Sequence, residues 1–165
     1  ARCGATPLGA AHYYGLRPHL MADVSVVARE GWGEWVPEVE QAAAFWLSCL
    51  DQDSSELSIL LTGDDEIHQL NQIYRQRDRP TDVLSFSQRE GEFPGPEAVL
   101  GDVVISIETA ERQATERGHS LRAEILELLA HGLLHLLGFD HELSDAEHER
   151  HLGKQAELLA ALAHR

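Results

Sequence analysis

The chain has 165 residues, with 13 basic and 28 acidic side chains and a formal net charge of −15 at pH 7. This length predicts one domain with a proper hydrophobic core. The acidic balance argues against binding of DNA, or of any bare nucleic acid, over a broad surface. It fits either a basic protein partner or a solvated surface without a partner. No stretch approaches the roughly eighteen apolar residues of a membrane helix, so no membrane partner is expected.

Residues 1–20 differ in composition from the rest of the chain. They contain Arg2 and Arg17 but no Asp or Glu, and the only methionine follows as Met21. We interpret 1–20 as a non-native or disordered N-terminal extension and 21–165 as a single domain. That domain then carries 11 basic and 28 acidic side chains, a net charge of −17. Its lone cysteine, Cys49, needs no disulfide and indicates a cytoplasmic protein.

Hydrophobic periodicity predicts four short strands and five helices in an α+β fold. In chain order, the expected elements are a strand at 24–27, a helix at 37–50, a strand at 57–61, a helix at 66–75, strands at 83–86 and 103–107, and helices at 108–117, 120–137 and 145–163. We expect a small mixed sheet packed with the helices, the fourth helix being central. Asp64 or Asp65 is expected to cap the second helix, and Ser120 the fourth.

The fourth helix carries a histidine pair. His131 and His135 are four residues apart, which places their rings about 40° apart around the helix axis and about 6 Å apart along it. On a continuous helix His141 would face away, but Gly138 can adopt the left-handed conformation that ends a helix and turns the chain back. We predict that the three histidines bind one zinc ion per chain. Three protein ligands leave a fourth position open, as in catalytic sites.

The same histidine and glycine spacing occurs in the metzincin proteases, which have a glutamate directly after the first histidine. That glutamate is the general base for peptide hydrolysis. Gly132 takes its place here. The substitution argues against a protease, although a zinc metalloprotease-like hydrolase of other substrates is kept as an alternative.

Three sequence blocks lie in order along the chain. They are N-Q-I-Y-R at 71–75 with P-T-D-V-L-S-F at 80–86, L-G-D-V-V-I-S at 100–106, and H-G-L-L-H-L-L-G-F-D-H at 131–141. Together they resemble the YbeY family of bacterial metal-dependent endoribonucleases, which act in ribosomal RNA maturation. Ser87 departs from the family, which usually has proline there, and this affects only the path of the following loop.

The resemblance implies a zinc-dependent, single-strand-specific endoribonuclease that acts in maturation of the 16S rRNA 3′ end and in ribosome quality control. It implies ribosomal RNA, the ribosome or small-subunit proteins as partners. It also implies His131, His135 and His141 as metal ligands, and Arg75 together with His131 as catalytic residues. A non-enzymatic ribosome-assembly factor with structural zinc is a further alternative.

An arginine suits phosphodiester cleavage because its guanidinium can hold the non-bridging oxygens with two donors. We expect Arg75 to form a small basic cleft beside the metal, with help from Arg77, Arg79 or Arg89. Asp140 can accept the second ring N–H of its neighbouring ligand. A position exposed to water at the helix end is an equal alternative for Asp140. Two further histidines on the last helix, His148 and His151, are expected to be exposed to solvent, with a second metal site or a tuning role as the alternative.

Overall fold

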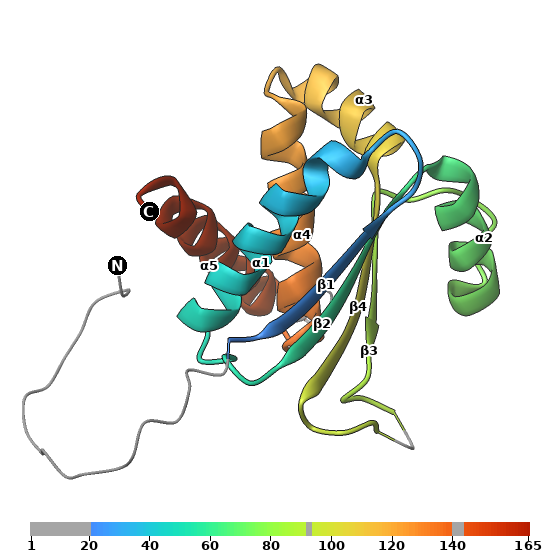
Figure 1. Cartoon of the computed structure of the whole chain (residues 1–165). Coiled ribbons are helices and arrows are strands. Elements are labelled where there is room, and N and C mark those ends of the chain that lie inside the picture. The colour runs from blue at the N-terminus through green and yellow to red at the C-terminus, as the bar shows by residue number, and fades with distance from the viewer. Residues whose placement is uncertain (1–20, 92–93, 140–143) are drawn as a thin grey trace, which may run out of the picture.

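A computed structural model of the chain describes residues 21–91, 94–139 and 144–165 (Figure 1). The proposed extension, 1–20, lies outside the described residues. The strands are β1 (Asp23–Ala28), β2 (Glu56–Thr62), β3 (Val83–Ser87) and β4 (Val99–Ser106), and the helices are α1 (Val36–Cys49), α2 (Asp64–Arg75), α3 (Ile107–Arg117), α4 (Leu121–Leu136) and α5 (Asp145–Ala163), with a 3-10 turn at Gly33–Trp35. None of these helices is both long and apolar enough to cross a membrane. The predicted α+β class is confirmed.

The four strands form one mixed sheet in the order β1-β2-β4-β3. Strands β1, β2 and β4 run parallel, and β3 runs antiparallel to β4 at one edge. Parallel neighbours need a crossover connection, which α1 supplies between β1 and β2. Because β3 lies at the edge, elements from both faces of the sheet can approach it.

Helices α1 and α4 cover one face of the sheet and enclose the main hydrophobic core (Figure 1). Leu61 of β2 and Ile105 of β4 pack there with Trp46 of α1 and Leu129 of α4, all fully buried. Helix α4 contacts α1, α3, α5 and two strands. It is therefore the central helix, and this explains why apolar residues occur around most of its circumference.

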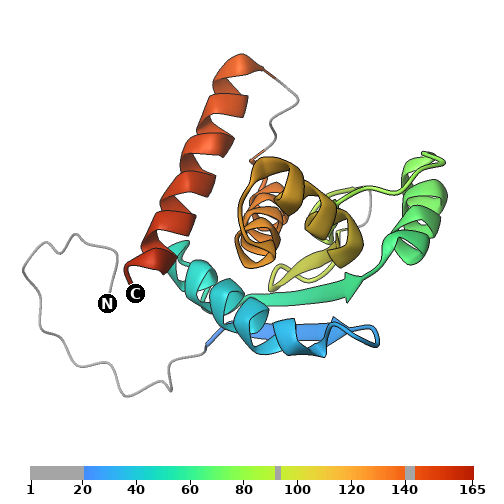
Figure 2. The same cartoon turned by 90° about the horizontal axis from the view of Figure 1, so that it is seen from above.

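Helix α5 packs on the outside of α1 and α4 (Figure 2). Trp46 donates a hydrogen bond from its indole nitrogen to the backbone oxygen of Leu158 at 2.8 Å. Both side chains are buried. This contact fixes the C-terminal half of α5 against α1.

Helix α2 covers the opposite face of the sheet (Figure 1). Its Ile67 is buried against Leu84 of β3 and Val104 of β4 in a second, smaller hydrophobic cluster. The sheet is thus covered on both faces, with α4 and α2 on opposite sides of β3 and β4.

Two predicted helix starts can be compared with the structure. The sequence pattern extends the last strand to 107, but β4 ends at Ser106 because this residue caps α3. Its Oγ accepts a hydrogen bond from the backbone N–H of Thr109 at 3.2 Å. Ser120 caps α4 in the predicted way, accepting from the N–H of Ala123 at 3.1 Å.

The prediction that Asp64 or Asp65 caps α2 is wrong. Gly63 is the N-cap residue, and it makes no side-chain cap bond. The Asp64 carboxylate instead accepts from the hydroxyls of Ser106 at 2.7 Å and Thr109 at 2.6 Å. These hydroxyls belong to the start of α3, so Asp64 ties α2 to the junction between β4 and α3.

A second carboxylate holds the same end of α2. Arg29, directly after β1, donates through Nε and Nη2 to Glu66 at 2.8 and 2.6 Å, and the hydroxyl of Thr62 donates to the same group. These bonds, that from Arg29 foremost, lower the pKa of Glu66 from an ordinary 4.5 to about 2. The N-terminal end of α2 is therefore anchored to the sheet, while its C-terminal end carries Arg75.

We expect Glu66→Gln to make folding less sensitive to acid. The folded-state pKa of Glu66 lies below the unfolded value, so its stabilisation is present above about pH 4.5 and is lost as the pH falls toward 2. Glu66 and Arg29 are both partly exposed, which limits the effect to about 1 kcal/mol. Urea unfolding at several pH values measures it, with exposed Glu40→Gln on α1 as the control. A pH profile of Glu66→Gln identical to that of the wild type would contradict this assignment.

Candidate metal centre

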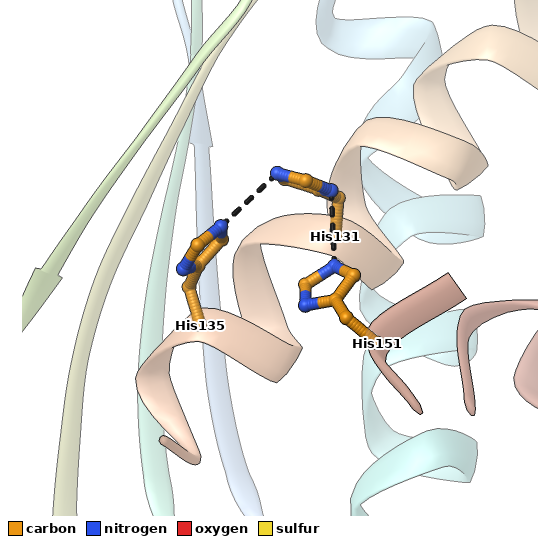
Figure 3. Close-up of side chains that lie close together, drawn as sticks. All are labelled: His131, His135 and His151. Atoms are coloured by element: carbon orange, nitrogen blue, oxygen red, sulfur yellow. Dashed lines mark hydrogen bonds between the residues drawn. The ribbon is translucent and has the colours of Figure 1, made fainter. Parts of the chain in front are cut away.

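His131 and His135 lie close together on α4 (Figure 3). Their Nε2 atoms are 3.1 Å apart and their ring centroids 4.7 Å apart. Two nitrogens bound to one tetrahedral zinc at about 2.0–2.1 Å would be separated by about 3.3 Å. The spacing of four residues therefore brings both rings within reach of one ion.

Helix α4 ends directly after this pair. Gly138 has a φ of +85°, in the left-handed region that favours glycine. Its N–H donates to the carbonyl of His135 at 3.1 Å, and the N–H of Phe139 donates to the carbonyl of Leu134 at 3.0 Å. These bonds close the last turn as the sequence predicts.

Two of the residues that the sequence singles out lie just beyond this turn. They are His141, the expected third ligand, and Asp140, its expected hydrogen-bonding neighbour. Both lie outside the described residues, so their roles stay predictions.

Gly132 faces the sheet. A Cβ atom at this position would lie 2.8 Å from Cγ1 of Val103, 3.1 Å from Oγ of Ser85 and 3.2 Å from Cγ2 of Val83. The hydroxyl of Ser85 also donates to the carbonyl of Gly132 at 3.0 Å. Glycine thus permits a close approach of α4 to β3 and β4. A glutamate here, as in the metzincins, would collide with the sheet, so this position cannot supply a protease base in this fold.

A third histidine reaches the pair from α5. His151 is fully buried, and its Nε2 lies 3.0 Å from Nδ1 of His131 (Figure 3). The prediction that His151 is exposed is wrong, whereas His148 is exposed as expected. Helical periodicity could have predicted this burial. His151 lies seven residues before the buried Leu158, and so on the same face of α5.

The histidines form a group that can bind a metal ion. His131, His135 and His151 each offer one ring nitrogen, and these three atoms lie within 4.8 Å of one another. Imidazole nitrogens suit borderline metals such as zinc. The donor chemistry present here fits the predicted metal centre.

A second cluster of potential ligands is a salt-bridge network. Glu124 is fully buried, and Nη1 of Arg117 lies 3.2 Å from its carboxylate and 3.2 Å from that of Glu127. His119 also bonds to Glu124. Because Arg117 and His119 already contact both carboxylates, we assign no metal to this cluster.

A cleft of about 810 Å³ opens beside the histidine pair. His131 and His135 line it together with Arg75 from the end of α2 and with Ser85 and Phe86 from β3. Nη2 of Arg75 donates to the carbonyl of Ser85 at 2.7 Å, and the guanidinium lies 5.9 Å from the centroid of the Phe86 ring. The fold thus brings Arg75 and two histidines, 56 residues or more apart in sequence, to one cleft.

The cleft is less basic than the sequence predicts. Arg89 turns away from it and donates to side chains of Gln52 at 3.2 Å and Ser55 at 3.3 Å. Among the described residues that line the cleft, Arg75 is the only arginine or lysine. Two acidic residues also line it: Asp82 and Glu90. Local positive charge therefore depends on Arg75 and on any bound metal.

A family model and several known proteins that are similar to this chain carry the same description. A family model described as Endoribonuclease YbeY matches residues 23–163. The Endoribonuclease YbeY of Aquifex aeolicus is 51% identical over 113 residues, which cover 68% of this chain and 74% of that protein. That of a Picosynechococcus species is 47% identical over 130 residues, covering 76% of each. A solution structure of a Thermotoga maritima protein is 25% identical, with a TM-score of 0.60 over 82% of this chain and 85% of the other.

We expect Gly132→Ala to destabilise the protein. Alanine favours a helix over glycine by about 1 kcal/mol, but the added methyl group would press on buried Val103, and such overpacking costs about 1–3 kcal/mol. Gly153→Ala is the matched control, since a Cβ at this helical glycine of α5 meets nothing within 4 Å. Urea unfolding compares the two. Equal gains in stability would show that α4 does not need glycine to approach the sheet.

Proposed function

Because the chain belongs to the YbeY family of endoribonucleases, we propose that it cuts single-stranded ribosomal RNA with the help of a zinc ion held by three histidines. Family membership makes the chain a hydrolase that acts on phosphodiester bonds within RNA. The finer proposal is a role at the 3′ end of 16S rRNA and in ribosome quality control, in the cytoplasm, with the ribosome or small-subunit proteins as partners.

The proposed ligands of one zinc ion per chain are His131, His135 and His141. The 3.1 Å separation of the two α4 Nε2 atoms supports this set, as does the helix end at Gly138, three residues before His141 in the sequence. When bound, the ion supplies Lewis-acid chemistry at the scissile phosphate. His131 belongs to the catalytic group through this contact.

The observation that carries the proposal is the guanidinium of Arg75 in the same cleft as the two imidazoles. A guanidinium has five N–H donors, and among the described residues the bond to the carbonyl of Ser85 uses one of its terminal nitrogens. The remaining donors can hold non-bridging phosphate oxygens, on which negative charge grows during cleavage. Arg75 is thus suited to stabilise the transition state.

The aromatic side chains beside Arg75 suit a single strand. Phe86 lines the cleft. The rings of Tyr74 and Phe86 pack edge to face, with their centroids 5.2 Å apart. Tyr74 is 64% exposed. Unpaired bases stack on such aromatic surfaces, whereas the bases of a duplex are stacked on one another and unavailable. This feature supports single-strand specificity.

The alternatives are weaker for specific reasons. A protease would need a general base, and the position that holds it in the metzincins faces the sheet here as Gly132. A non-enzymatic assembly factor could also use Arg75 to hold an RNA phosphate, but the family that the chain matches is one of endoribonucleases.

We expect Arg75→Ala to reduce cleavage of single-stranded RNA by about 10²–10³-fold, because it removes charge stabilisation in the transition state. Zinc content and stability should stay near the wild-type values, since Arg75 is exposed and is not a ligand. Arg75→Lys should recover only part of the activity, since lysine lacks the two-donor fork. Exposed Arg77→Ala is the control. Wild-type cleavage by Arg75→Ala would remove this residue from the mechanism.

Zinc-loaded protein should cut a single-stranded fragment of ribosomal RNA but not the same fragment annealed to its complement. A chelator should abolish the cleavage, and added zinc should restore it. Denaturing gels of end-labelled RNA measure both effects. Cleavage that persists in chelator would argue against metal dependence, and equal cleavage of the duplex would argue against single-strand specificity. Hydrolysis of an unstructured protein such as casein would favour the protease alternative.

A further inference from the structure

His151 joins three parts of the structure through its two ring nitrogens. Its Nδ1 lies 2.9 Å from the carbonyl oxygen of Phe139, in the turn that follows α4. Its Nε2 lies 3.0 Å from Nδ1 of His131 (Figure 3). The side chain is fully buried. A neutral imidazole has one donor nitrogen and one acceptor nitrogen, so these two contacts can be assigned to it.

The two contacts determine where the ring protons lie. A carbonyl oxygen only accepts, so Nδ1 of His151 must carry the hydrogen that bonds to Phe139. In a neutral imidazole the other nitrogen is then an acceptor. Nε2 of His151 therefore accepts, and Nδ1 of His131 must donate to it. His131 then carries its hydrogen on Nδ1, and Nε2 is the nitrogen that bears the lone pair.

That same Nε2 is the atom that faces His135, at 3.1 Å from Nε2 of the second histidine. It therefore points to the place where the metal ion is proposed to bind. Only the tautomer with hydrogen on Nδ1 can bind a metal through Nε2. The hydrogen-bond chain from Phe139 through His151 selects this tautomer.

We propose that His151 is a positioning residue that sets the tautomer and ring orientation of His131 for metal binding. This inference rests on the metal site proposed above and adds to it a residue outside the predicted ligand set. His151 belongs to the group of histidines that could hold an ion, but the Phe139 carbonyl and His131 engage its two nitrogens. We therefore assign it a role through His131 and not as a ligand. It also ties α5 to the turn that leads toward His141.

Losing such an outer hydrogen-bond partner typically weakens metal binding by about 10–100-fold. If the histidine only filled space, its replacement would weaken metal binding no more than another substitution that removes the same amount of packing. The two roles are therefore separable by metal affinity measured against a packing control.

Three α5 variants of the full chain make the comparison. His151→Leu removes both polar atoms. His151→Gln keeps an acceptor for His131 and a donor for Phe139 on one planar amide. Leu158→Ala removes buried apolar contacts of α5 without a change in the hydrogen-bond chain. Competition with a chromophoric chelator gives the zinc affinity of each, and urea unfolding gives its stability.

We expect His151→Leu to bind zinc about 10–100-fold more weakly than the wild type, and His151→Gln to stay within a few-fold of it. Leu158→Ala should bind zinc normally although it is less stable. Equal zinc affinities for His151→Leu and Leu158→Ala would overturn the proposal, since His151 would then act through packing alone. A loss in His151→Gln as large as in His151→Leu would also overturn it, because a direct ligand behaves in that way.

The tautomer can be measured without any metal. Long-range ¹H–¹⁵N correlation spectra of the metal-free protein report which ring nitrogen of His131 carries the hydrogen. We expect Nδ1–H in the wild type and in His151→Gln, and a mixture of tautomers in His151→Leu. Nε2–H as the main form in the wild type would refute the proposal. A wild-type protein that binds no zinc would instead refute the proposed function, and the spectra would still decide the role of His151.

Discussion

The close approach of α4 to the sheet is the constraint on which the site depends. Val103, Ser85 and Val83 leave no room for a side chain at Gly132. Successive helical residues point about 100° apart, so the rotation of α4 that turns Gly132 into the sheet turns His131 and His135 toward the cleft. The same orientation of α4 therefore packs the helix on the sheet and directs the two imidazoles toward the cleft, and Gly132 permits this orientation.

Ser85 connects the two halves of the site. Its hydroxyl donates to the carbonyl of Gly132 on α4, and its own carbonyl accepts from Arg75 on α2. The two helices lie on opposite faces of the sheet (Figure 1), and they can meet at one cleft because β3 is an edge strand. Glu66 and Asp64 hold the other end of α2 against β1, β2 and the start of α3, which limits how far Arg75 can move.

The charge of the protein and the charge of its substrate are both negative, so binding of RNA requires positive charge that is concentrated in one place. The net charge is −15, and the lining of the cleft includes two carboxylates. A broad basic surface is therefore not the basis of recognition. In the proposed function, one arginine, a metal ion and aromatic rings for unpaired bases would form a small site, in which attraction acts over short distances and is less screened than at an open surface.

Local sequence determined the elements of this protein, the i, i+4 pair of His131 and His135, and the helix end at Gly138, because periodicity and backbone preference act over a few residues. It could not determine contacts between distant segments. His151 was expected in solvent and is buried, since its environment depends on how α5 docks, with Trp46 bonded to a residue 112 positions away. Arg89 turns to residues 34 and 37 positions earlier in the chain for the same reason. The tertiary structure alone decided which polar groups meet, because hydrogen-bond partners are set by the packing of whole helices and strands.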